Sequence, residues 1–97
     1  MQNFAVIRHY RFDKKNSDQI DQKVKDVFMP LLKECKGFVH YYWIDSGLGE
    51  GASVSIFRSK AEGEASNELA AEFVRRNLEG LITQKPEIIE GYISADN

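Results

Sequence analysis

The side chains best suited to chemistry stand in one run of four: His40, Tyr41, Tyr42 and Trp43. Imidazole ordinarily titrates near neutral pH, so His40 could act as a general base. Such a base could take the proton of a phenol or an enol, and Tyr42 could then hold the resulting anion. The same rings could instead fill a core while their polar tips find local hydrogen bonds, and packing is the favoured interpretation of the run as a whole.

A second pair of candidates, Arg8 and His9, lies in the β-forming run NFAVIRHY at 3–10. Neighbouring residues of a strand point to opposite faces of the sheet, so the two side chains are expected to be separated. A charge in the middle of a central strand is costly unless it is paired, and Glu90 is a possible partner for Arg8. An ion pair or a dimer contact is favoured for Arg8 over an anion-binding site. His9 is ranked just behind His40 as the base.

Two further residues are candidates for binding a substrate. Asn67 lies beside the apolar stripe of a predicted helix, where it could hydrogen-bond a ligand lodged between helix and sheet, although a solvated asparagine is the more frequent case. Trp43 would line the same pocket together with Tyr42 and Arg8. No cofactor is expected, because two histidines on separate strands and one distant cysteine do not have the spacing of a zinc site. Neither a flavin nor a nicotinamide fingerprint is present.

Two remaining motifs, at 47–51 and 36–43, argue against phosphate-loop and RNA-binding functions. The segment GLGEG at 47–51 is followed by a strand instead of a helix, so it predicts a hairpin turn and not a phosphate loop. The segment KGFVHYYW at 36–43 matches only the first three positions of an RNA-recognition motif, and the net charge is −2. We therefore expect neither a nucleic-acid nor a membrane partner. A lone cysteine, Cys35, fits a reducing cytoplasm.

Hydrophobic spacing and turn signals predict the element order β-α-β-β-α-β. The predicted strands are 3–10, 38–45, 52–57 and 87–94, and the predicted helices are 16–35 and 59–78. Capping boxes, Asn16 with Gln19 and Ser59 with Glu62, would open the two helices. Pro30 falls inside the first helix, where we expect a kink near residues 26–30 or a division into two short helices.

This order is typical of the α+β, ferredoxin-like βαββαβ sandwich, in which both helices cover one face of a four-stranded antiparallel sheet. Residues 1–97 are expected to form a single domain. The strands carry apolar residues on both sides, since Phe4 and Val6 point one way while Ala5 and Ile7 point the other. The face without helices would then expose an apolar patch, which monomers rarely do. We therefore predict a homodimer through that face.

Three segments resemble the dimeric α+β barrel proteins, and among them the antibiotic biosynthesis monooxygenase type. They are PLLKECKGF at 30–38, VSIFRSK at 54–60 and IIEGYI at 88–93. The resemblance covers nearly the whole chain and implies a homodimeric α/β barrel. It also implies a range of activities: cofactor-free oxygenation of polycyclic phenols or anthrones, haem degradation, rearrangement of small metabolites, or no assigned activity.

Haem degradation fits this chain poorly. Members of the family with that activity use an asparagine on the first strand and a tryptophan and a histidine on the second helix. The corresponding positions here hold Ile7, Ser66 and Arg76.

Two functions remain open from the sequence. The first is a cofactor-independent, monooxygenase-like enzyme that acts on a small aromatic or enolisable molecule in a pocket between sheet and helices. In it His40 or His9 is the base, while Tyr42, Trp43, Asn67 and Arg8 bind the substrate. The second is a non-catalytic ligand-binding or stress-response dimer in which the same aromatic side chains only fill the core.

Overall fold

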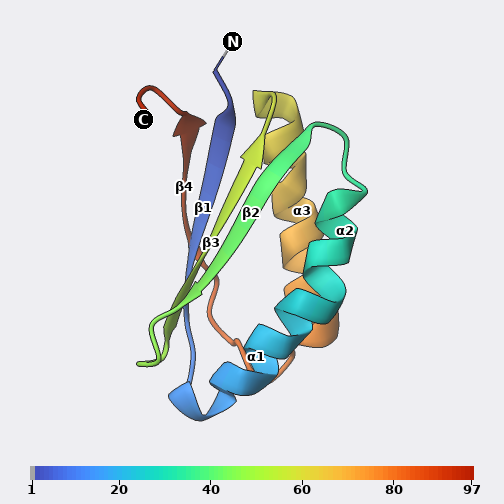
Figure 1. The fold of residues 1–97 in the computed structure, drawn as a ribbon. Coiled ribbons are helices and arrows are strands. Elements are labelled where there is room, and N and C mark those ends of the chain that lie inside the picture. The colour runs from blue at the N-terminus through green and yellow to red at the C-terminus, as the bar shows by residue number, and fades with distance from the viewer. Residues whose placement is uncertain (1) are drawn as a thin grey trace.

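The computed structural model describes residues 2–97 and contains one sheet covered by helical segments (Figure 1). The strands are β1 (Phe4–Arg11), β2 (Phe38–Asp45), β3 (Glu50–Phe57) and β4 (Glu87–Tyr92), and the helices are α1 (Ser17–Lys23), α2 (Met29–Lys33) and α3 (Lys60–Asn77). The strands are antiparallel in the order β2-β3-β1-β4. This arrangement confirms the ferredoxin-like α+β fold that the sequence predicts.

The first helical stretch contains the predicted irregularity at Pro30. A single π-helical turn, η2 (Val24–Phe28), joins α1 to α2 directly ahead of the proline. Proline has no N–H to bond to the carbonyl of the preceding turn, and a wider turn takes up the mismatch. The predicted cap is wrong, however. A short 3₁₀ turn, η1 (Lys14–Asn16), comes first, and the Asp13 side chain caps it by accepting a hydrogen bond from the backbone N–H of Lys15 at 3.0 Å.

The predicted cap of α3 is confirmed. The Ser59 hydroxyl accepts the backbone N–H of Glu62 at 3.3 Å and donates to the Glu62 carboxylate at 2.9 Å. In the first turn, a Cβ atom added at Gly63 would lie only 2.5 Å from Cδ2 of Phe4. The absence of a side chain at Gly63 therefore lets α3 approach β1 closely. That approach brings Ser66 and Asn67, one turn further along, down onto the sheet.

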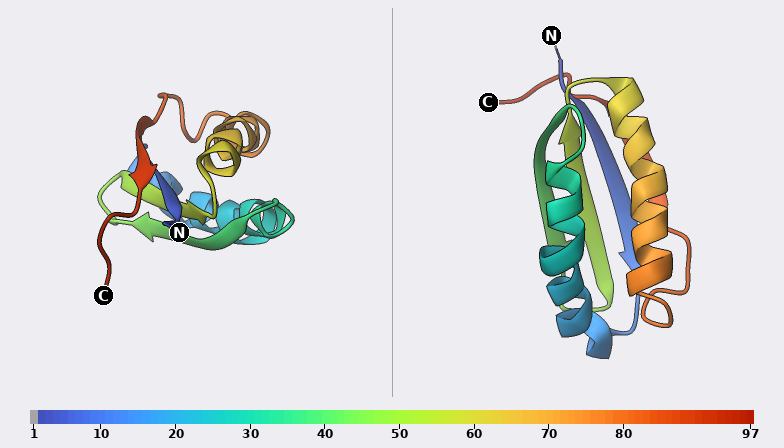
Figure 2. Two further views of the ribbon diagram at one scale, coloured as in Figure 1. Left: turned by 90° about the horizontal axis from the view of Figure 1, so that it is seen from above. Right: turned by 90° about the vertical axis from the view of Figure 1, so that its right-hand side faces the viewer.

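Both helical stretches cover the same face of the sheet and lie side by side across it (Figure 2). The core between them is aromatic at its centre, where the ring centroids of Phe28 and Phe73 are 4.8 Å apart and those of Phe28 and Tyr41 are 5.4 Å apart. Buried aliphatic side chains surround these rings; they include Ile20, Val24, Leu32, Leu78 and Ile82. The ring of Tyr41 therefore fills the core, as the packing interpretation of the aromatic run expects.

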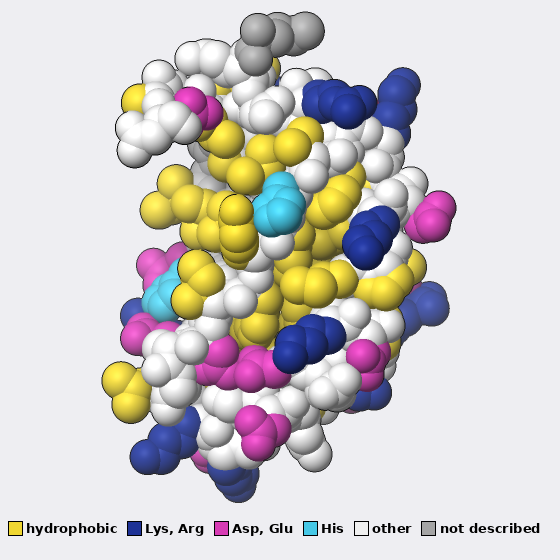
Figure 3. All heavy atoms as spheres, in the orientation of Figure 1, with side chains coloured by type: hydrophobic (Ala, Val, Ile, Leu, Met, Phe, Trp, Pro, Cys, Tyr) yellow, Lys and Arg dark blue, Asp and Glu magenta, His cyan; other side chains and the backbone are white. Residues whose placement is uncertain are grey.

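The opposite face of the sheet has no helix on it and carries large apolar side chains. Ile7, Tyr42, Ile44 and Ile89 are 36%, 53%, 54% and 72% exposed. We call this surface the open face. Hydrophobic side chains gather on it together with histidine (Figure 3).

Candidate functional site

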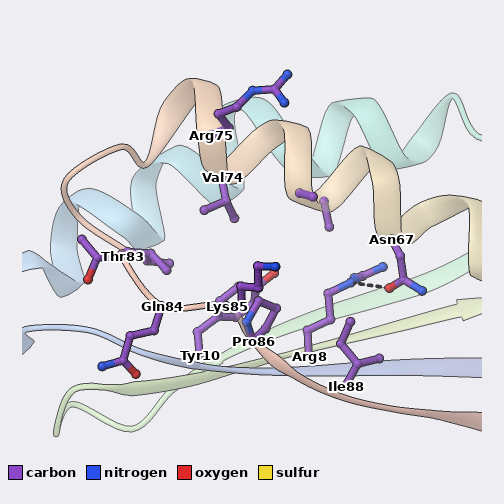
Figure 4. A pocket seen from close by; sticks show the side chains of 13 residues that line it. Arg8, Tyr10, Asn67, Val74, Arg75, Thr83, Gln84, Lys85, Pro86 and Ile88 are labelled. Carbon is purple, nitrogen blue, oxygen red and sulfur yellow. Dashed lines mark hydrogen bonds between the residues drawn. The ribbon is translucent and has the colours of Figure 1, made fainter.

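A cavity of about 400 Å³ lies between the sheet and α3 (Figure 4). Its floor comes from β1 and the start of β4, its roof from α3, and its end wall from the segment 82–86. The apolar part of the lining consists of Ala70, Ala71, Val74, Ile82, Pro86 and Ile88. A volume of this order, with mostly apolar walls and a few polar groups, is typical of a site for a small organic molecule.

Arg8 is a buried, charged residue in the lining of this cavity. Its side chain rises from β1 toward α3 and is only 1% exposed (Figure 4). The guanidinium donates to Asn67 Oδ1 at 3.0 Å, to Ser66 Oγ at 2.7 Å and to Ser55 Oγ at 3.3 Å. All three acceptors are neutral, so they solvate the guanidinium without cancelling its charge.

The predicted ion pair between Arg8 and Glu90 is wrong. Asn67 lies between the two residues, because its Oδ1 accepts from Arg8 while its Nδ2 lies 3.4 Å from Glu90 Oε2. Within residues 2–97, no salt bridge joins the Arg8 guanidinium to a carboxylate. Burial lowers the pKa of Arg8 from its ordinary value, but arginine starts so high that it stays charged at neutral pH. The site therefore holds a buried positive charge without a direct counter-charge.

The other titratable groups of the lining are a phenol and two cations. Burial raises the pKa of the Tyr10 hydroxyl, so this group is protonated at neutral pH and can donate a hydrogen bond. Arg75 and Lys85 lie at the exposed rim of the cavity, and Arg75 donates to Glu72 at 2.9 Å. The lining itself contains neither histidine nor carboxylate. The lining therefore offers positive charge and hydrogen-bond donors, and it lacks a histidine or carboxylate that could accept a proton.

The structure does not place His40 and Tyr42 in this cavity. Both lie on the open face, where they pair with Ile56 and Val54 of β3, and their ring centroids are 4.6 Å apart. Their predicted position in a pocket between sheet and helices is wrong. A bulge between Phe38 and His40 sets which side chains of β2 face the helices, and the sequence gives no sign of it.

His9 also lies on the open face, away from the cavity. Its Nε2 is 3.2 Å from Glu50 Oε1 and its Nδ1 is 3.4 Å from Glu87 Oε1. Arg11 donates to the same Glu50 oxygen at 3.0 Å. His9 therefore belongs to a hydrogen-bonded cluster at the surface with Glu50 and Glu87, and the prediction that it lies in a pocket between sheet and helices is also wrong.

Trp43 faces the helices but does not line the cavity. Its indole N–H donates to Asp21 Oδ1 of α1 at 2.8 Å, and its ring stacks on Phe12 with centroids 6.4 Å apart. The structure therefore brings together only two of the predicted site residues, Arg8 and Asn67. Sequence reasoning missed Tyr10, which the two-residue period of a strand places on the same face as Arg8.

Residues 2–97 contain no group of three histidine, cysteine, aspartate or glutamate side chains arranged to hold a metal ion. In the same part of the chain, no helix has both the length and the apolar character needed to cross a membrane.

Comparison with known proteins relates this chain to others through its fold. No family model matches it, and no curated protein matches it in sequence. Among solved structures, a protein of unknown function from Nitrosomonas europaea superposes with a TM-score of 0.82 at 16% identity, covering 100% of this chain and 94% of that one. A monooxygenase from the gene ActVA-Orf6 of Streptomyces coelicolor, in complex with the ligand nanaomycin D, superposes with a TM-score of 0.76 at 12% identity, covering 99% and 91%.

A candidate antibiotic biosynthesis monooxygenase from Nitrosomonas europaea gives a TM-score of 0.79 at 6% identity, with 96% of this chain and 91% of that chain covered. At such low identities these likenesses show the fold alone. The chain has an antibiotic biosynthesis monooxygenase-like fold, and the resemblance drawn from its sequence is confirmed at that level.

Proposed function

We propose that this protein is a cofactor-independent monooxygenase that oxidises a small aromatic or enolisable molecule inside the cavity beneath α3. The observation that carries the proposal is the Arg8 guanidinium, 1% exposed and held by neutral acceptors in the lining of a mostly apolar cavity. Arg8 and Asn67 bind the substrate, and Tyr10 donates a hydrogen bond to it. His40, His9 and Tyr42 take no part in the chemistry of this cavity, because they lie on the other side of the sheet.

The reaction needs an electron-rich anion, since molecular oxygen reacts slowly with neutral, closed-shell molecules. An anthrone illustrates the balance. Its CH₂ group loses two hydrogens and becomes a C=O group, one oxygen atom of O₂ enters that carbonyl, and the other leaves as water with the two hydrogens. No external reductant is required. The protein's part is to stabilise the anion electrostatically and to keep water away from the reactive intermediate.

Oxygen uptake with dithranol, a dihydroxylated anthrone, tests this proposal. Purified protein should consume O₂ above the rate of spontaneous oxidation, and isotopically labelled O₂ should place one labelled atom in the quinone product. Arg8→Met should remove most of the enhancement, whereas Arg76→Met, an exposed charge outside the cavity, should not. Rates equal to those with heat-denatured protein would reject the enzyme. Bound but unoxidised dithranol would favour the non-catalytic ligand-binding dimer instead.

The same proposal covers the architecture around the cavity. Residues 1–97 form one domain, and two copies pair through their open faces, where Ile44 and Ile89 are more than half exposed. The charges at one end of that face, among them Arg11 and Glu50, are already paired within one copy. Two apolar patches can therefore meet without burying unpaired charge. The cytoplasm is the proposed location, because a single thiol, Cys35, fits a reducing compartment.

A further inference from the structure

We infer that Arg8 takes the place of a catalytic base: the cavity binds a planar phenol or enol as its anion, and binding itself lowers the pKa of that ligand. This inference rests on the proposed function, since it concerns the same cavity. It names the substrate class, an acidic hydroxyl on a planar carbon framework, and the residue that selects it.

The first argument is the state of the Arg8 guanidinium. A guanidinium carries five N–H groups, and three of them have partners within the described residues. Burying a charge without a counter-charge is strongly unfavourable. A ligand oxyanion at this position would supply the missing charge and accept the remaining hydrogen bonds. Hydrogen bonds between a guanidinium and an oxyanion are stronger than hydrogen bonds between neutral groups.

The second argument is the sign of every titratable group that lines the cavity. Arg8, Arg75 and Lys85 are cations, and Tyr10 is a protonated phenol. The nearest acid to Arg8 that the structure connects to it is Glu90, which reaches Asn67 and not the guanidinium. Arg75 is paired with Glu72 at the rim, so the buried charge of Arg8 dominates, and apolar walls strengthen its field. The field in this cavity therefore favours an anion over the neutral acid of the same shape.

The third argument is the absence of a proton acceptor from the lining. A neutral phenol that enters must lose its proton to water at the mouth of the cavity, because no histidine or carboxylate lines it. The O–H bond breaks, the proton passes to solvent, and the oxygen is left to accept N–H groups from Arg8. Asn67 fixes the direction of the guanidinium by holding its Nε at 3.0 Å.

A matched pair of probes tests the inference on the unmodified protein. Para-nitrophenol ionises near neutral pH and turns yellow as the anion, whereas para-nitroanisole has nearly the same shape and cannot ionise. We expect the anion to bind about tenfold to a hundredfold more tightly than the ether. A pH titration of the bound phenol, followed by its colour, should show its pKa lowered by about one unit or more. Amide NMR signals of Ala70 and Ala71 should move with both probes.

Variants of Arg8 show whether this residue selects the ligand anion or only supports the shape of the cavity. Arg8→Met should abolish the pKa shift although para-nitroanisole still binds, and Arg8→Lys should restore part of the shift. Arg76→Met serves as the control for lost surface charge. Equal binding of phenol and ether, or an unshifted pKa, would overturn the inference even if dithranol is oxidised. A shifted pKa without oxygen uptake would keep the inference and reject the monooxygenase. Binding of neither probe would overturn the inference, and the dithranol assay would then decide on the monooxygenase by itself.

Discussion

Gly63→Ala offers a test in which two ordinary effects have opposite signs. Glycine in a helix interior is less favourable than alanine by about 1 kcal/mol, so helix propensity alone predicts that the substitution stabilises the protein. Gly63, however, is buried in the first turn of α3 against β1. An added Cβ would lie 2.5 Å from Cδ2 and 3.1 Å from Cε2 of Phe4, and 3.4 Å from Cγ2 of Val6. The two nearest of these atoms belong to the rigid ring of Phe4, which is itself only 3% exposed.

The steric overlap with Phe4 decides whether Gly63→Ala raises or lowers the free energy of unfolding. Extra atoms in a packed interior cost about 1–3 kcal/mol, and about 2 kcal/mol, the middle of that range, exceeds the gain in propensity by about 1 kcal/mol. We therefore expect Gly63→Ala to unfold more easily by about 1 kcal/mol, which corresponds to a melting temperature about 4–8 °C lower for a chain of this size. The variant should also weaken para-nitrophenol binding, because lifting the start of α3 draws Ser66 and Asn67 away from Arg8.

Urea unfolding followed by circular dichroism measures this effect. Ala65→Gly, at an exposed position two residues further along α3, reports helix propensity alone and should cost about 1 kcal/mol. Combining Gly63→Ala with Phe4→Leu should recover part of the loss, so the double-mutant cycle should show favourable coupling. A Gly63→Ala protein that is more stable than the wild type would refute the close packing of α3 on β1.

Three further predictions concern the cap, a buried phenol and the open face. Ser59→Ala should lower the free energy of unfolding by about 1 kcal/mol in urea titrations, because the N–H of Glu62 loses its acceptor; an unchanged midpoint would contradict the cap. Burial raises the pKa of the Tyr41 hydroxyl, so its ionisation favours the unfolded chain. Stability should be full below about pH 10 and fall above it, and Tyr41→Phe should flatten that fall in urea unfolding curves measured across the alkaline range. Tyr42→Glu should shift sedimentation toward the monomer while the circular dichroism spectrum stays the same; a variant that sediments like the wild type would contradict pairing through the open face.

The fold could be predicted from the sequence because its signals are local. A run of β-forming residues marked the first strand at 3–10, against Phe4–Arg11 in the structure, and the Ser59 cap marked the start of α3. Pro30 marked an irregular turn, and the structure contains one directly ahead of it. Each of these features depends on residues close together in the chain. Pairing of two copies is a longer-range property and stays a prediction.

The candidate site was only partly predictable because it depends on contacts between distant segments. The two-residue period of a strand separates Arg8 from His9, but it does not say which of the two faces the helices. Phe4 and Val6, which pack under Gly63, decide that Arg8 does. The end wall at 82–86 belongs to no regular element and carries no sequence signal. The candidates His40 and Tyr42 were chosen for their chemistry, because the sequence does not show which face of the sheet their side chains occupy. The structure places both on the open face.

NMR titration of isotope-labelled protein with para-nitrophenol tests the central claim most directly, namely that the ligand site is the cavity at Arg8 and not the histidine-bearing open face. The account predicts that the Nε–H signal of Arg8 and the backbone signals of Ala70 and Ile88 shift together in a saturable way, while those of His40 and Tyr42 stay in place. Shifts confined to His40 and Tyr42, with Arg8 unmoved, would contradict it.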